Sequence, residues 1–98
     1  MNNYILDENG DPVREPDPIK WAIWYEQADR VVARTTIGDA EVSTVFLALD
    51  HSFNPEEVLL YETMIFGGDF DDHTFRYPDR QAAEIGHAKA VAMVTGEV

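Results

Sequence analysis

Most residues of this chain that can do chemistry are carboxylates, and one group of them has the spacing of a metal-binding loop. Asp7, Asn9 and Asp11 match the first ligand positions of a calcium-binding loop, in which side-chain oxygens alternate along a tight turn. That loop needs a glycine where this chain has Pro12, and a bidentate glutamate where it has Pro18. We therefore predict a turn here and not a calcium site.

A second group of possible metal ligands lies in the C-terminal half of the chain. Carboxylate oxygens together with a histidine can hold magnesium, manganese or zinc. The spacing of this group matches no motif of defined coordination geometry. We expect no metal and no cofactor, and we keep as an alternative a metal-dependent enzyme that uses the acidic 69–73 loop. The residues are Asp69, Asp71, Asp72 and His73, with Asp50 and His51 available from another predicted loop.

Asp50, His51 and Ser52 are the three residue types of a catalytic triad, but they are consecutive in the chain. Side chains of consecutive extended residues point apart, whereas a triad needs them to converge. The chain has no cysteine, no glycine-rich phosphate loop and no nucleophile-elbow motif. Ser43 falls inside a predicted strand, and His87 is expected in solvent on a helix surface. The sequence therefore favours a protein that works by binding over an enzyme.

Charge is the strongest global feature of the sequence. The 98 residues include 19 Asp and Glu against 7 Lys and Arg, which gives a formal net charge of −12. Such a chain is repelled by nucleic acids and by anionic membranes, so we expect direct binding to neither. Its expected partners are basic protein surfaces. Because the sequence has no cysteine and no signal-peptide pattern at its N-terminus, we expect a cytoplasmic protein.

The carboxylates gather in three groups, each in a predicted turn or loop that displays its charge. If these loops converge on one edge, about six to eight carboxylates along roughly 15–20 Å would approach the charge density of B-DNA. Asp17 extends the first group and Asp79 the last. The expected partner-binding residues are Asp7, Glu8, Asp11 and Glu15 in the first group, Asp50, Glu56 and Glu57 in the second, and Asp69, Asp71 and Asp72 in the third.

The elements that position these loops centre on two apolar segments, residues 40–49 and 58–66. Both are rich in β-branched, aromatic and aliphatic residues, and both are apolar on two faces, which is typical of central strands covered on both sides. The intervening loop is too short for a helical crossover, so we predict an antiparallel pair. Residues 29–37, with Val31, Ala33 and Ile37 facing inward, and residues 74–77 should add strands on either side.

Two helices and a hairpin complete the prediction. Residues 4–14 should form a hairpin, and Asp17 with Pro18 should begin a helix that runs to residue 28. We expect the aromatic side of this helix to pack in the core, although a virion protein that self-assembles through exposed aromatics remains an alternative. The last helix should run over residues 80–94. The aromatics are Trp21, Trp24 and Tyr25, and the predicted core stripe of the last helix is Ala82, Ile85, Gly86, Ala90 and Met93.

These elements predict one α+β domain over residues 1–98. Its sheet should be an antiparallel meander of three or four strands, with one helix before it and one helix after it.

Several segments of the sequence resemble a family of small acidic proteins of bacteriophages and mobile elements. These segments are LDENGDPV, WAIWYEQADRVVARTTIGD, VSTVFLALDHSF, YETMIFGG and RYPDRQAAEIGHAKAV, and they span nearly the whole chain. Where this chain reads HSFNPEEVLLYETM, the family often has a glycine-rich loop, so the charge of this loop is a local feature.

The chain is also similar in size, charge and lack of cysteine to anti-CRISPR proteins, several of which act as DNA mimics. This resemblance implies a monomeric inhibitor in the cytoplasm of an infected bacterial host. Its implied partner is the basic DNA-binding surface of a type I CRISPR–Cas surveillance complex, which it would keep from binding target DNA. The resemblance supplies no catalytic residues.

Overall fold

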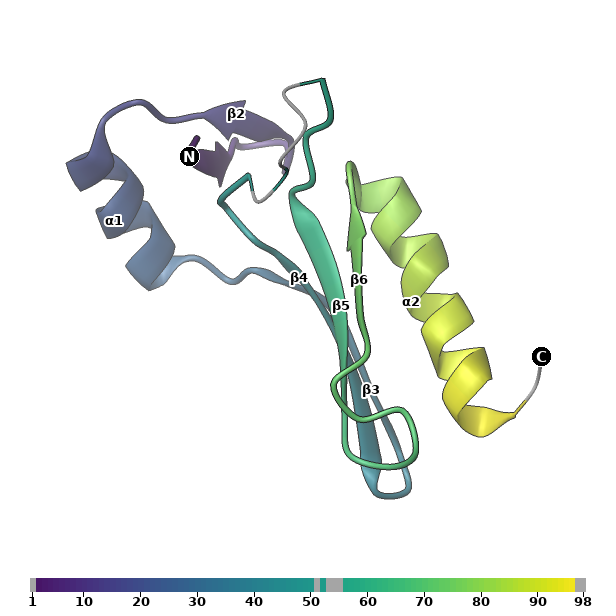
Figure 1. Cartoon of the computed structure of the whole chain (residues 1–98). Helices are drawn as coiled ribbons and strands as arrows, with labels where there is room; N and C mark the ends of the chain where they lie inside the picture. Colours follow the sequence, from purple (N-terminus) through teal and green to yellow (C-terminus); the bar gives the residue numbers. More distant parts are fainter. Residues whose placement is uncertain (1, 51, 53–55, 97–98) are drawn as a thin grey trace.

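The computed structural model describes residues 2–50, 52 and 56–96, which form two helices and two antiparallel sheets (Figure 1). The predicted α+β class is confirmed, with one helix before the larger sheet and one after it. The order of elements is β1 (Tyr4–Leu6), β2 (Pro12–Arg14), α1 (Pro18–Gln27), β3 (Val31–Ile37), β4 (Ala40–Phe46), β5 (Tyr61–Phe66), β6 (Thr74–Tyr77) and α2 (Arg80–Thr95).

The larger sheet is the predicted meander, with strand order β3-β4-β5-β6 and every neighbouring pair antiparallel. The central pair is β4 and β5, in which Val42 lies opposite Ile65 and Thr44 opposite Thr63. All four of these side chains are fully buried. The strand positions predicted from apolar character are therefore correct for the centre of the sheet.

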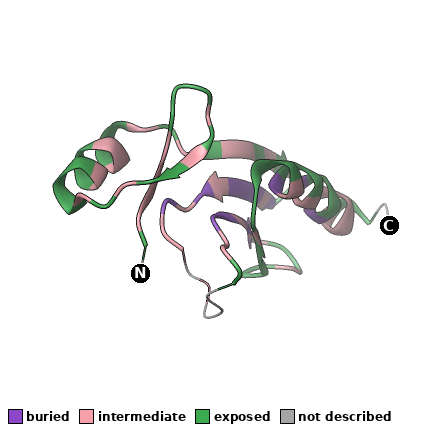
Figure 2. Cartoon of the chain, turned by 90° about the horizontal axis from the view of Figure 1, so that it is seen from above, coloured by how far each residue is buried: buried purple, intermediate pink, exposed green. Residues whose placement is uncertain are grey.

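Helix α2 covers one face of this sheet and contacts all four strands. Its N-terminus is capped by Asp79, whose carboxylate accepts a hydrogen bond from the Ala82 amide at 2.8 Å, as predicted. Gly86 allows the helix to lie close to the sheet, because a Cβ atom there would overlap the ring of Tyr77. The buried residues in Figure 2 accordingly gather on the strands and on the facing side of α2.

The buried side of α2 agrees with the predicted stripe at Gly86, Ala90 and Met93 but not at Ile85. Ala83, His87 and Ala90 are buried, whereas Ile85 is 52% exposed. At about 100° per residue, Ile85 lies on the opposite side of the helix from Ala83 and His87. The prediction placed Ile85 in the core because it is apolar and His87 in water because it is polar. Both placements were wrong, since hydroxyl groups of the sheet supply hydrogen bonds for a buried histidine.

The opposite face of the sheet carries no second helix among the described elements, so the expected cover on both sides is not found. Two ion pairs lie on this face instead. Arg34 Nε lies 2.9 Å from Glu41 Oε1, and Arg76 Nε lies 3.0 Å from Glu62 Oε2. Phe66 on the same face is 47% exposed. On this face, charged side chains of the edge strands β3 and β6 flank the central strands β4 and β5, and they take the place of the expected second layer.

Helix α1 and the β1–β2 hairpin pack at the end of the sheet where β4 ends and β5 begins (Figure 1). Trp21 Nε1 donates hydrogen bonds to the carbonyl oxygens of Tyr4 at 3.0 Å and Ala48 at 3.1 Å. The Trp24 ring meets Phe46 edge to face, with centroids 5.9 Å apart. The prediction that these aromatics belong to the core is confirmed, although α1 has no fully buried residue.

Strand boundaries also differ from those predicted. β4 ends at Phe46, because Ala48 turns the chain with a φ of 64°. In β3, the register shifts between Val31 and Ala33, so the inward alternation of this strand does not extend to Val31, which is 40% exposed. The prediction that Val31 faces inward was wrong because a bulge of this kind leaves no clear signal in the pattern of side chains.

Candidate acidic interaction surface

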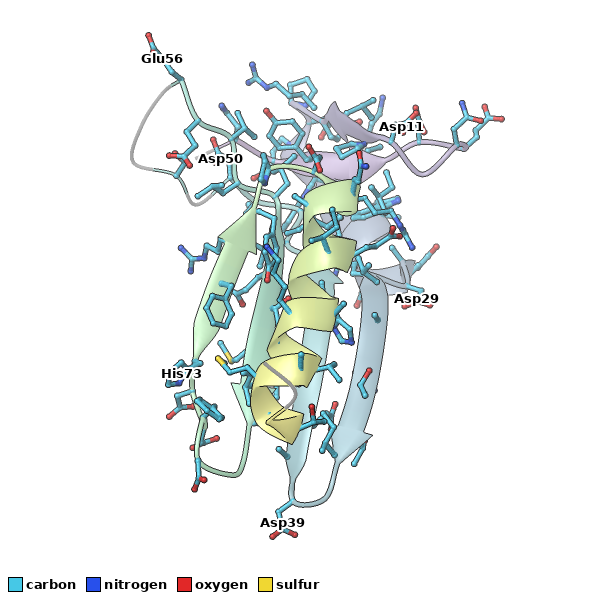
Figure 3. The ribbon with its side chains drawn as sticks, turned by 90° about the vertical axis from the view of Figure 1, so that its right-hand side faces the viewer. Asp11, Asp29, Asp39, Asp50, Glu56 and His73 are labelled. Atoms are coloured by element: carbon cyan, nitrogen blue, oxygen red, sulfur yellow. The ribbon has the colours of Figure 1, made fainter. Side chains whose placement is uncertain are left out.

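The predicted acidic loops lie at two opposite ends of the molecule, which extends 43 Å along its longest axis. The hairpin and the connection between β4 and β5 share one end, and the β5–β6 loop lies at the other end beside the β3–β4 turn (Figure 1). Figure 3 accordingly places Asp11, Asp50 and Glu56 far from Asp39. We call the first set the hairpin end: Asp7, Glu8, Asp11, Glu15, Asp50, Glu56, Glu57 and Asp79. We call the second set the far end: Asp39, Asp69, Asp71 and Asp72.

At the hairpin end, the turn between β1 and β2 is organised by Asp7. One carboxylate oxygen of Asp7 accepts hydrogen bonds from the amides of Asn9 and Asp11, both at 2.9 Å. Gly10 adopts a φ of 82°, which completes the predicted turn. Glu8 and Asp11 are exposed, so the turn presents their charge to solvent while Asp7 maintains its shape.

The connection between β4 and β5 brings its own carboxylates to the hairpin end. Asp50 accepts hydrogen bonds from the amides of Ser52 at 3.0 Å and Leu59 at 3.3 Å, so it organises this connection. The Asp50 amide also donates to the carbonyl oxygen of Asn2 at 3.1 Å, which ties the connection to the N-terminal segment. Glu56 and Glu57 are exposed. His51, considered above as a triad member and metal ligand, lies outside the described residues.

At the far end, the β5–β6 loop is also closed by a carboxylate. Asp71 accepts a hydrogen bond from the Gly67 amide at 2.6 Å, and Asp72 adopts a φ of 69°. The ring of His73 lies near Phe70 and Phe75, with centroid separations of 5.5 and 6.4 Å. Within residues 2–50, 52 and 56–96, no three His, Cys, Asp or Glu side chains are grouped so that they could hold a metal ion.

Several carboxylates of the two acidic ends are positioned by main-chain amides, namely Asp7, Glu15, Asp50, Asp71 and Asp79. Between described residues, the ion pairs engage Glu41, Glu62 and Glu84, which belong to β4, β5 and α2 and to neither acidic end. An amide hydrogen bond holds a carboxylate in place without cancelling its charge. The acidic ends therefore combine carboxylates that main-chain amides hold in place with carboxylates that are exposed to solvent. The loop and cap carboxylates that accept amide hydrogen bonds are Asp7, Glu15, Asp17, Asp29, Asp50, Asp71 and Asp79.

A hollow of about 420 Å³ opens at the hairpin end between the β1–β2 turn and the first turn of α2. Asp11 lines it from the hairpin, while Asp79 and Arg80 line it from the start of α2. Tyr61 of β5 also lines it, although the residue is fully buried and its hydroxyl has no hydrogen-bond partner. Burial raises the pKa of Tyr61, Arg80 lowers it, and Asp11 and Asp79 raise it further. The sequence prediction missed Tyr61 because it is an ordinary strand aromatic by pattern.

A buried polar cluster joins α2 to the sheet, away from both acidic ends. His87 Nδ1 lies 2.7 Å from Thr44 Oγ1, and His87 Nε2 lies 2.9 Å from Thr35 Oγ1. The Thr44 hydroxyl also bonds the hydroxyl of Thr63. Burial lowers the pKa of His87, so the neutral ring is favoured. This arrangement satisfies a histidine inside the core and does not present it to a substrate.

The chain has no match among known protein families, curated proteins or solved structures. No helix of the described part is long and apolar enough to cross a membrane.

The structure brings together two of the three predicted acidic groups. Asp7, Glu8, Asp11 and Glu15 share an end with Asp50, Glu56 and Glu57, and the predicted residues Asp69, Asp71 and Asp72 lie at the other end. Asp39 also belongs to the far end, where it lines the same hollow as Asp69. The sequence could have placed it there, because the β3–β4 and β5–β6 turns of a meander lie at the same end of the sheet.

Proposed function

We propose that this protein is a non-enzymatic inhibitor that covers the basic, nucleic-acid-binding surface of a partner protein and thereby acts as an acidic DNA mimic. The observation that supports this proposal most directly is the set of carboxylates fixed by main-chain amides. Such groups resemble phosphates in two respects, because they carry negative charge and their positions are set by a backbone.

The two acidic ends suggest how a groove would be occupied. The longest axis of 43 Å corresponds to about 13 base pairs of B-DNA at about 3.4 Å per pair. Charge is concentrated at the two ends, and the open sheet face between them carries the paired Arg34 and Arg76. We propose two-point contact with a Lys- and Arg-lined channel, in which the hairpin end makes the main contact because it holds more carboxylates. Electrostatic steering would make association fast and sensitive to salt.

We propose a type I CRISPR–Cas surveillance complex in the bacterial cytoplasm as the partner, with this protein bound as a monomer to the DNA-recognition surface. The support is the resemblance to small acidic phage proteins together with the charge of −12. A partner that binds DNA by its phosphates has the complementary charge, and it would lose DNA once that surface is covered.

The two alternative functions have less support from the described residues. For a metal-dependent enzyme in the 69–73 loop, Asp71 is engaged by Gly67 and the His73 ring lies near Phe70 and Phe75. For a self-assembling virion protein, the aromatics of α1 would have to be exposed, but Trp21 and Trp24 pack within the monomer.

The proposal is tested with purified type I surveillance complexes and labelled duplex target DNA. Preincubation with this protein should prevent the mobility shift that the complex gives with DNA, and the protein should co-elute with the complex in size-exclusion chromatography. A Glu8→Lys/Asp11→Lys variant provides the matched control and should inhibit far less. Undiminished DNA binding across a panel of type I complexes, without co-elution, would overturn this choice of partner.

A further inference from the structure

We infer that the hollow between the β1–β2 turn and the start of α2 receives an arginine side chain of the partner. This inference rests on the proposed function, and it names one specific contact within the hairpin end. The hollow is distinct from the general surface charge, because it combines two carboxylates with a buried polar group that lacks a partner.

The first observation is the hydroxyl of Tyr61. The residue is 0% exposed, and no described group donates to its hydroxyl or accepts from it. A buried hydroxyl without a partner costs free energy, so its presence at a cavity points to a polar group that enters there. Asp11, Asp79 and Arg80, whose charges act on this hydroxyl, line the same hollow as Tyr61. The hydroxyl and the charged groups therefore belong to one site.

The second observation is the sign of the charge. Asp11 and Asp79 bring two negative charges, whereas Arg80 brings one positive charge that is shared with Glu84 through an ion pair of 3.0 Å. An anion bound at the N-terminus of α2 would be repelled by both carboxylates. The Ala82 amide, which could otherwise bind an anion there, already donates to the Asp79 carboxylate. A cation is therefore the complementary ligand.

The third observation concerns the shape of the ligand. A volume of about 420 Å³ has room for a guanidinium group and part of its methylene stem. Guanidinium is planar and presents five donors in a fixed fork, which suits carboxylates that come from two elements, Asp11 from the hairpin and Asp79 from the start of α2. The apolar atoms of Pro12 and the Tyr61 ring offer contact for the stem. An ammonium group is compact and strongly hydrated, so lysine fits this arrangement less well.

The test uses the intact, isotope-labelled protein and N-acetyl-arginine amide as the probe, followed by NMR chemical-shift titration. The amides of Asn9, Asp11 and Gln81 should shift in a saturable way. N-acetyl-citrulline amide, which has a similar shape without the charge, should bind at least about tenfold more weakly, and N-acetyl-lysine amide should fall between the two. Equal titration curves for the arginine and citrulline probes would overturn the inference.

Two variants and one control locate the site. Asp11→Asn should lower the affinity for the arginine probe about tenfold, and Tyr61→Phe should lower it about threefold to fivefold, because each substitution removes one hydrogen-bond acceptor. Tyr61→Phe should leave folding intact, since the hydroxyl that it removes has no partner. Glu8→Gln, in the same turn but outside the hollow, should change the affinity less than about twofold. An unchanged affinity in Tyr61→Phe would mean that the arginine probe does not reach the hydroxyl, and the inference would fail.

The failure of this inference is separable from the failure of the proposed function. If the arginine probe does not bind but charge reversal at the hairpin end still abolishes inhibition, the hollow is not an arginine site and DNA mimicry stands. If the probe binds at the hollow but no basic partner is inhibited, the arginine site stands and the proposed function is wrong.

Discussion

The imidazole of His87 on α2 is bonded to the hydroxyl of Thr44 on β4, with 2.7 Å between Nδ1 and Oγ1. The other ring nitrogen bonds Thr35 at 2.9 Å. One side chain thereby links the helix to two strands, and both of its polar atoms are satisfied inside the core. The contact contributes to stability only while the ring can remain neutral, because no described carboxylate is paired with it.

The first prediction is a pH-dependent stability that originates from His87. Burial lowers the pKa of His87 below its ordinary value of 6.5. Below about pH 6.5, the unfolded chain takes up a proton at this residue before the folded chain does, so the free energy of unfolding should fall as the pH drops. Urea unfolding between about pH 7.5 and about pH 5.5 measures the effect, above the range in which most carboxylates titrate.

The control for this prediction is the comparison of two histidine variants. His87→Gln should be less stable at neutral pH but should lose most of the pH dependence in this window. His73→Gln, at an exposed position of the β5–β6 loop, should retain it. A His87→Gln variant with the full pH dependence of the parent would assign the effect to other groups.

The second prediction concerns the close approach of α2 to β6 at Gly86. In Gly86→Ala, the added methyl group would overlap the ring of Tyr77, so we expect a loss of about 1–3 kcal/mol in the free energy of unfolding. In a Tyr77→Ala background, the ring is absent and the same substitution should stabilise the helix by up to about 1 kcal/mol. Denaturant unfolding of the four proteins in this cycle checks the reversal of sign, and a loss in both backgrounds would show that the contact is not the cause.

The third prediction is that the indole N–H of Trp21 is a structural hydrogen-bond donor. It bonds the carbonyl oxygens of Tyr4 and Ala48, which connects α1 to β1 and to the segment that follows β4. Trp21→Phe should therefore cost about 1–3 kcal/mol of stability through lost hydrogen bonds and lost packing. Trp24→Phe also removes ring area, but it does not remove the hydrogen bonds that link α1 to β1 and to Ala48. Thermal denaturation should therefore show a smaller decrease in melting temperature for Trp24→Phe than for Trp21→Phe. A larger decrease for Trp24→Phe would contradict this assignment.

The fourth prediction distinguishes the two acidic ends in partner binding. Glu8→Lys/Asp11→Lys at the hairpin end should weaken binding to the basic partner by about 30- to 100-fold, because two attractions become two repulsions. Asp39→Lys/Asp69→Lys makes the same change in net charge at the far end and should cost about tenfold or less. All four positions are exposed, and none of the four side chains organises its own loop through a hydrogen bond that the structure shows.

Binding should be measured for both variants and the parent at two salt concentrations. The parent should lose affinity steeply as salt rises, and the hairpin-end variant should show a weaker dependence. Equal losses in the two variants would mean that net charge alone matters. Affinity that is unchanged by both reversals and flat with salt would contradict charge mimicry.

Several features of this protein follow from the sequence alone because they depend on neighbouring residues. Asp17 and Asp79 cap their helices as predicted, since a cap is made with amides two or three residues away. The Asn9-Gly10 turn and the order of the strands are also local or nearly local, and so is the display of carboxylates in loops. The α+β class follows from these segments taken together.

The remaining features were decided by contacts between residues far apart in the chain. His87 looks like a surface residue until Thr44 and Thr35 supply its hydrogen bonds, and Tyr61 looks like ordinary core until the hairpin and α2 leave its hydroxyl facing a hollow. The opposite placement of Asp50 and Asp69 is likewise a property of the meander, in which successive loops emerge at opposite ends of the sheet. Tertiary structure decides such features because burial and charge proximity depend on which surfaces meet, and residue type constrains that only weakly.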